Sequence, residues 1–206
     1  MAFEKVIVGN ATLYLGDCLE VLPTLDPVDC IISTMPAGQD SNLYLNDEAD
    51  TYPEFLTNFL SVVPDHNLLA ILRIKKPDWD YLFQDFKEFK EEDFPSFKKP
   101  QIGIIFPDSY VKLVYKGTPS TGFRDRIIAT NTHLEDEQLF TPYQWAPEFK
   151  YFVNCFTATG ETVLDPGMGT GTTGIAAVEA GRKFIGIEID PDAFDKALRR
   201  FQRILT

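Results

Sequence analysis

Histidine and cysteine are scarce in this chain, and their scarcity excludes several kinds of site. Only His66, His133, Cys18, Cys30 and Cys155 are present among 206 residues. The cysteines have neither the spacing of zinc ligands nor that of a redox motif, so we expect no metal site. We expect them to be reduced core residues of a cytoplasmic protein.

Basic residues and long apolar runs are also in short supply. Lysine and arginine total 19 against 31 aspartates and glutamates, which gives a net charge of −12. Because neutralised phosphates supply most non-specific affinity for nucleic acid, this charge excludes a protein that coats nucleic acid unaided. No stretch reaches the roughly 18 apolar residues of a membrane span, and the N-terminus lacks the features of a signal peptide. We therefore expect no membrane association.

What the chain does contain is an alternation of strand-like and helix-like segments. We expect strands at 11–15, 29–33, 67–74, 101–106, 110–115, 162–164 and 183–189. We expect helices at 18–25, 52–63, 79–94, 145–157, 172–180 and 191–205. This order is typical of an α/β fold with a doubly wound, mostly parallel sheet. The length predicts one domain spanning residues 1–206.

A glycine-rich loop between two strands dominates the C-terminal part of the sequence. It follows the strand at 162–164 and leads into the helix at 172–180. Gly169 to Gly174 reads GTGTTG, the dinucleotide-binding pattern, and Glu188 follows at about the expected ~20 residues. Ile175 stands where a phosphate-binding P-loop would have its lysine. The loop therefore predicts a nucleotide-like ligand other than a P-loop triphosphate.

A longer stretch narrows the ligand. Asp165–Thr173 reads DPGMGTGTT and Phe184–Asp190 reads FIGIEID. Together they resemble the S-adenosylmethionine site of the DNA methyltransferases that act on N6 of adenine or N4 of cytosine. The resemblance implies a Rossmann-like methyltransferase fold and this set of cofactor-binding residues: Asp17, Asp165, Gly167, Met168, Gly169, Gly171, Thr172, Thr173 and Glu188. It places the glycine loop at the methionine part and Glu188 at the ribose hydroxyls, to which a carboxylate offers two acceptors.

The order of the motifs resembles the circularly permuted members of that family. Only one helix follows Asp190, so the next strand of the sheet has to come from the N-terminus, at 11–15. The resemblance then implies that Asp17 accepts a hydrogen bond from the adenine amino group of the cofactor. From its residue type alone, Asp17 is equally suited to cap the helix that begins at Cys18.

The chain departs from the family at its catalytic motif. After Val28–Ser33, the family has Asp-Pro-Pro-Tyr or Ser-Pro-Pro-Tyr. Here the corresponding catalytic positions are Thr34, Met35, Pro36 and Ala37. A threonine can still accept one hydrogen bond from the target amino group, whereas an alanine cannot stack on a flipped base. Between residues 117 and 140 there is also no room for a sizeable target-recognition insert.

Two interpretations therefore stay open. The first is an active DNA amino-methyltransferase with an unusual motif. The second is an inactive methyltransferase-fold binding or regulatory module, that is, a pseudoenzyme or a partner subunit. A nicotinamide oxidoreductase is disfavoured because the chain lacks a separate substrate region. In either case we expect weak DNA binding by the protein alone, with a partner protein or homodimer as the means of strengthening it.

Overall fold

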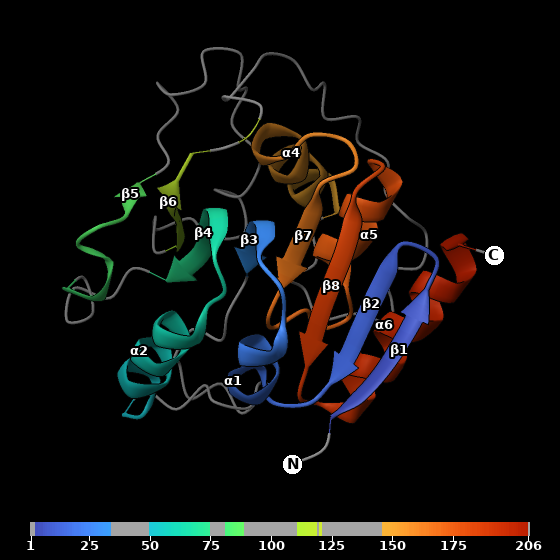
Figure 1. Cartoon of the computed structure of the whole chain (residues 1–206), viewed down its shortest axis with the longest axis horizontal. Coiled ribbons are helices and arrows are strands. Elements are labelled where there is room, and N and C mark those ends of the chain that lie inside the picture. The colour runs from blue at the N-terminus through green and yellow to red at the C-terminus, as the bar shows by residue number, and fades with distance from the viewer. Residues whose placement is uncertain are drawn as a thin grey trace.

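The computed structural model describes residues 3–33, 50–74, 81–88, 111–118, 120 and 146–205. These residues form an eight-stranded sheet in the order β1-β2-β8-β7-β3-β4-β6-β5 (Figure 1). The strands are β1 (Glu4–Val8), β2 (Ala11–Leu15), β3 (Val28–Ser33), β4 (His66–Ile74), β5 (Lys87–Glu88), β6 (Val111–Gly117), β7 (Thr162–Asp165) and β8 (Lys183–Glu188). The helices are α1 (Cys18–Val21), the 3₁₀ turn η1 (Leu22–Thr24), α2 (Tyr52–Val62), α4 (Ala146–Phe156), α5 (Thr172–Glu179) and α6 (Pro191–Leu205).

The middle of the sheet is parallel and its borders are antiparallel. Strands β2, β8, β7, β3 and β4 run in one direction. Strand β1 runs against β2, and β6 runs against both β4 and β5. The predicted doubly wound, mostly parallel α/β fold is confirmed.

Helices cover both faces of the sheet. Side chains of α4, α5 and α6 pack on one face with Cys30, Ile32 and Val163. Side chains of α1 and α2 pack on the other face with Ile31 and Leu164. The middle positions of β3 and β7, Ile31–Ile32 and Val163–Leu164, are apolar because a parallel strand buried on both faces needs apolar side chains in both directions.

The winding of the chain reverses between β7 and β3, and this reversal determines where a ligand can bind. Strands β7 and β3 are neighbours in the sheet. The chain leaves β7 for α5 on one face and reaches α2 on the opposite face after β3. In such sheets the crevice for a ligand opens at the carboxyl ends of the two strands where the winding reverses. The glycine loop after β7 and the predicted catalytic motif after β3 both start at this edge.

The predicted permutation is also confirmed. Strand β2 pairs in parallel with β8, with Ala11 opposite Phe184 and Leu15 opposite Glu188. The N-terminus thus supplies the strand next to the cofactor-type βαβ unit, and the arrowheads of β2 and β8 point the same way in Figure 1.

One sequence prediction needs correction. The helix expected at 79–94 is wrong over residues 81–88, where a short 3₁₀ turn at 81–83 precedes strand β5. The rings of Phe83 and Phe86 pack edge to face with their centroids 5.3 Å apart, and both belong to the core on the α2 side of the sheet. This tertiary packing and the pairing of β5 with β6 outweigh the helical spacing of the aromatic residues.

The expected antiparallel pair is described only in part, and its pairing stays a prediction. Residues 111–117 do form strand β6, but β6 pairs with β4 and β5. The expected partner at 101–106 lies outside the described residues. Strand β1 was not predicted, because its exposed edge position requires no regular apolar alternation.

Candidate functional site

The glycine loop spans residues 166–171, between β7 and α5. Gly169 and Gly171 have φ values of 53° and 85°, which side-chain-bearing residues rarely adopt. A Cβ on Gly171 would lie 2.8 Å from Cε2 of Phe201 on α6. A Cβ on Gly169 would have nothing within 4 Å. The loop is therefore packed against α6 on one side and presents its Gly169 backbone to open space on another.

Asp165 is the carboxylate at the base of this loop. It is 1% exposed, and its Oδ1 accepts a hydrogen bond of 3.2 Å from the Gly167 amide. Burial raises the pKa of Asp165 to about 7, against the opposing effect of hydrogen bonds from the Thr173 side chain and the Gly167 amide. The charge of this carboxylate therefore changes near neutral pH and responds to a neighbouring charge.

Glu188 ends β8 and holds the loop from the other side. Its Oε2 accepts a hydrogen bond of 2.7 Å from the Gly169 amide, and its Oε1 accepts one of 2.9 Å from the Asp190 amide. Burial raises the pKa of Glu188, and these backbone hydrogen bonds oppose that effect. Each oxygen keeps acceptor capacity for a further donor, such as one hydroxyl of a vicinal pair.

Asp17 lies at the same edge, after β2. The Gly16 amide donates to the Glu188 carbonyl at 2.9 Å, which places the two strand ends together. The Asp17 side chain accepts from the Leu19 amide at 2.9 Å and so acts as the N-cap of α1. The capping role is thus observed, and the contact of Asp17 with an adenine stays a prediction.

The remaining predicted cofactor residues support the loop from within. Met168 is 4% exposed, and a Cβ on Gly186 would lie 2.3 Å from its sulfur. Its amide donates to the Ile187 carbonyl at 2.9 Å. Thr172 and Thr173 are buried in the first turn of α5. The side chain of Met168 therefore anchors the loop to the sheet, and the cofactor contact predicted for it stays untested.

Arg200 of α6 contacts the loop and was missed as a site residue. One of its guanidinium nitrogens, Nη1, donates to the Thr170 carbonyl at 2.7 Å. An arginine near the C-terminus of a helix is expected to interact favourably with the helix dipole, and this expectation does not point to the loop. The contact joins residues 30 positions apart, so local spacing carries no signal for it.

Strand β3 brings a different polar group to the same edge. Ser33 is its last residue and is fully buried. Its Oγ is the one buried side-chain polar atom without a hydrogen-bond partner that the described residues contain. The predicted catalytic positions Thr34, Met35, Pro36 and Ala37 follow directly and lie outside the described residues.

No group of three or more His, Cys, Asp or Glu residues among those described could hold a metal ion. None of the described helices is long and apolar enough to cross a membrane. All three cysteines are buried thiols that form no disulfide, as predicted for core residues, and burial raises the pKa of the Cys18 thiol to about 12.

Comparison with protein families gives a direct match for the C-terminal region. Residues 146–199 match a family model described as DNA methylase. The DNA adenine methyltransferase YhdJ of Escherichia coli K12 is 43% identical over 70 residues, which are 33% of this chain and 24% of that protein. The chain thus spans about a quarter of the length of this curated relative.

Solved structures match over most of the chain. The PvuII DNA methyltransferase, which is cytosine-N4-specific, superposes with a TM-score of 0.62 at 15% identity, covering 96% of this chain and 90% of that one. The M1.HpyAVI–SAM complex superposes with a TM-score of 0.59 at 18% identity, covering 92% of this chain and 99% of that one. At these identities the likeness establishes the fold.

Proposed function

We propose that the chain, which is similar in part to DNA methyltransferases, binds S-adenosylmethionine and methylates an exocyclic amino group of a DNA base. The observation that carries the proposal is the glycine loop held between Asp165 and Glu188 at the carboxyl edge of the sheet. YhdJ supplies the precedent for adenine and the PvuII enzyme that for cytosine.

The residues present fit S-adenosylmethionine. The open space in front of Gly169 allows a ligand to approach the loop backbone closely. The two oxygens of Glu188, already oriented by backbone amides, suit the ribose hydroxyls. Asp165 suits the cationic methionine part, since a nearby positive charge favours the carboxylate form. When bound, this cofactor supplies a methyl group activated by its sulfonium.

The acceptor base would have to reach the crevice between the ends of β7 and β3. In the proposed reaction Thr34 accepts a hydrogen bond from the target amino group and so aims its lone pair at the methyl group. This orientation is the main contribution that the protein makes to a one-step transfer. Ala37 offers no aromatic ring on which a flipped base could stack. Such stacking contributes roughly 1–3 kcal/mol. We therefore expect turnover to be slower, by about one to two orders of magnitude, than with an aromatic residue at this position.

The test is methyl transfer from labelled S-adenosylmethionine to mixed-sequence DNA. The wild type is compared with Glu188→Ala and with the combined variant Thr34→Asp, Met35→Pro and Ala37→Tyr. Slow transfer by the wild type, none by the Glu188 variant and faster transfer by the combined variant would support the proposal. Cofactor binding without transfer by the wild type or the combined variant would instead indicate a binding or regulatory module.

We further propose that residues 1–206 act as a single methyltransferase domain that depends on a partner protein or a second copy for DNA affinity. The basis is the net charge of −12, which predicts weak duplex binding at physiological salt. Titration of labelled duplex DNA at two salt concentrations tests it. Sub-micromolar binding by the isolated monomer would contradict it.

A further inference from the structure

The crest of the glycine loop is Thr170 together with its peptide link to Gly171. Thr170 stands between Gly169 and Gly171, two residues in the left-handed region. Glycines lose more backbone freedom on ordering than other residues, so a fixed crest requires compensating contacts. Asp165 contacts the amide of Gly167 and Glu188 contacts that of Gly169, both on the approach to the crest.

Arg200 makes contacts at the crest itself. Its Nη1 lies 2.7 Å from the carbonyl oxygen of Thr170, 3.2 Å from Thr170 Oγ1 and 3.2 Å from Thr172 Oγ1. One guanidinium end thus bridges the loop and the first turn of α5. The carbonyl contact is a second anchor for the peptide plane between Thr170 and Gly171, because the Gly171 amide in that plane also donates to the Met168 carbonyl at 2.8 Å.

The helix that carries Arg200 is itself docked onto the loop. Phe201 stacks on Phe184 of β8 with ring centroids 5.5 Å apart. The same Phe201 closes the space beside Gly171, where a Cβ would approach it to 2.8 Å. Arg200 therefore projects from a rigid support. A fixed arginine contributes more to the order of a loop than a mobile surface arginine does.

We propose that Arg200 is a positioning residue of the cofactor site, which fixes the loop crest so that the Gly169 backbone is presented to the ligand before it binds. This inference rests on the proposed function in that the ligand is S-adenosylmethionine. Its physical basis is pre-organisation: a loop ordered in the free protein pays less conformational entropy on binding.

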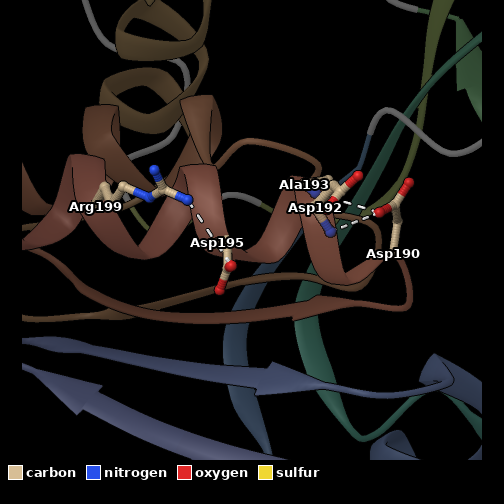
Figure 2. A network of polar contacts seen from close by, with 5 residues as sticks. All are labelled: Asp190, Asp192, Ala193, Asp195 and Arg199. Atoms are coloured by element: carbon tan, nitrogen blue, oxygen red, sulfur yellow. Dashed lines mark hydrogen bonds and ion pairs between the residues drawn. The ribbon is translucent and has the colours of Figure 1, made fainter.

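The test compares Arg200→Met with Arg200→Lys and with a matched control, Arg199→Met. Arg199 is the adjacent residue of α6, exposed and paired with Asp195 at 3.8 Å (Figure 2). Methionine keeps the length and apolar stem of arginine but removes all donors. Lysine keeps the charge but lacks the planar fork, so it restores the crest contacts only in part.

Two measurements are made on each variant. The first is hydrogen exchange of the Gly171 amide, which donates to Met168, with the Gly181 amide, which donates to Val178, as internal reference. The second is the affinity for S-adenosylmethionine by calorimetry. In Arg200→Met we expect the Gly171 amide to exchange about tenfold faster, while exchange of the Gly181 amide stays unchanged. We also expect this variant to bind S-adenosylmethionine about tenfold more weakly. A tenfold change corresponds to the loss of one net hydrogen bond of about 1.4 kcal/mol.

The outcomes are separable. Arg200→Lys should be intermediate in both measurements, and Arg199→Met should match the wild type. Unchanged Gly171 exchange in Arg200→Met, or equal acceleration of Gly171 and Gly181, would overturn the inference because the effect would then be absent or global. If the wild type binds no S-adenosylmethionine, the proposed function fails, while the exchange measurement still decides whether Arg200 orders the crest.

Discussion

Strands β7 and β3 lie side by side and end at the same edge, yet the polar groups at their ends differ in their contacts. Asp165 at the end of β7 accepts hydrogen bonds from the Gly167 amide and the Thr173 side chain. Ser33 at the end of β3 is fully buried with no partner for its hydroxyl. An unpaired buried hydroxyl costs about 1–3 kcal/mol.

This difference indicates which half of the site is organised in advance. On the β7 side, backbone amides and carboxylates already hold the glycine loop in place, so a cofactor would find its contacts formed. On the β3 side, the last described polar atom retains unused hydrogen-bonding capacity. Unsatisfied buried groups of this kind are rare, and a functional position is one recognised reason for keeping one.

The largest effect should come from removing the carboxylate of Glu188. Glu188→Ala deletes the contacts to Gly169 and Asp190 and both proposed ribose acceptors. At about 1.5–3 kcal/mol for each of the two proposed ribose hydrogen bonds to the carboxylate, we expect S-adenosylmethionine affinity to fall by roughly two to four orders of magnitude in calorimetry. Glu179→Ala is the matched control, since Glu179 is exposed and pairs with Lys150 at 3.5 Å. Equal binding by wild type and Glu188→Ala would show that the organised half does not serve the cofactor.

The next effect tests how tightly the loop is packed against α6. In Gly171→Ala, the positive φ costs about 1–2 kcal/mol and the contact with Phe201 about 1–3 more. Gly160 has a similar φ of 88° but nothing within 4 Å of a Cβ, so Gly160→Ala should show the backbone cost alone. Urea unfolding of both variants measures the difference. Equal destabilisation would mean that Phe201 moves aside freely.

The pH dependence of stability offers a third way to sharpen the comparison, through Asp165. Its pKa is raised by burial from 3.8 to about 7, so between those pH values the folded state binds a proton that the unfolded state does not. The free energy of unfolding should therefore rise as the pH falls through 7, by at most about 1.4 kcal/mol per pH unit, and level off below 4.

Burial also raises the pKa of Glu188, which therefore changes the stability with pH in the same direction. The variant Asp165→Asn removes only the titration of Asp165, so its difference from the wild type isolates that contribution. Urea unfolding of both proteins at pH 5 and pH 8 gives the comparison. We expect the wild type to gain stability relative to the variant at pH 5. A difference that does not change with pH would contradict the assignment of the titration to Asp165.

How far the sequence predicted this structure depends on the range of the contacts involved. The unit from β7 to α6 was predicted to within one or two residues at each boundary, because glycines, a proline and strand-end acids are local signals. The helix expected at 79–94 failed at 81–88, since Phe83 and Phe86 serve a cluster formed by distant segments. Strand β1 was likewise not predicted, because it is defined by its pairing with β2 at the edge of the sheet and its own residues give no clear signal.

The candidate site divides in the same way. The resemblance named Asp165, Gly169, Gly171 and Glu188, and the structure brings all four to one edge. It could not name Arg200, whose contact with Thr170 depends on how α6 docks over the loop. The helix cap made by Asp17 could be predicted from its residue type. That the Ser33 hydroxyl is buried without a hydrogen-bond partner could not, because this depends on the packing around it. Local chemistry was thus predictable and cross-element contacts were not.

The smallest effect is expected at Ser33, and it tests the other side of the comparison. Ser33→Ala removes a hydroxyl that has no partner in the free protein, so no hydrogen bond is lost. The free energy of unfolding should change by less than about 0.5 kcal/mol or increase, because the desolvation cost of the hydroxyl disappears. Thr157→Ala is the contrasting control, since the Thr157 hydroxyl is equally buried but donates to the Val153 carbonyl and accepts from Arg182.

Methyl transfer by Ser33→Ala then decides what the hydroxyl is for. If its spare capacity serves the acceptor, transfer to DNA should slow while S-adenosylmethionine affinity and stability stay at wild-type values. That combination would assign Ser33 to the acceptor half and separate it from the Glu188 phenotype, in which binding itself is lost. A clear destabilisation of Ser33→Ala would instead show that the hydroxyl has a structural partner, and the contrast between the ends of β7 and β3 would no longer hold.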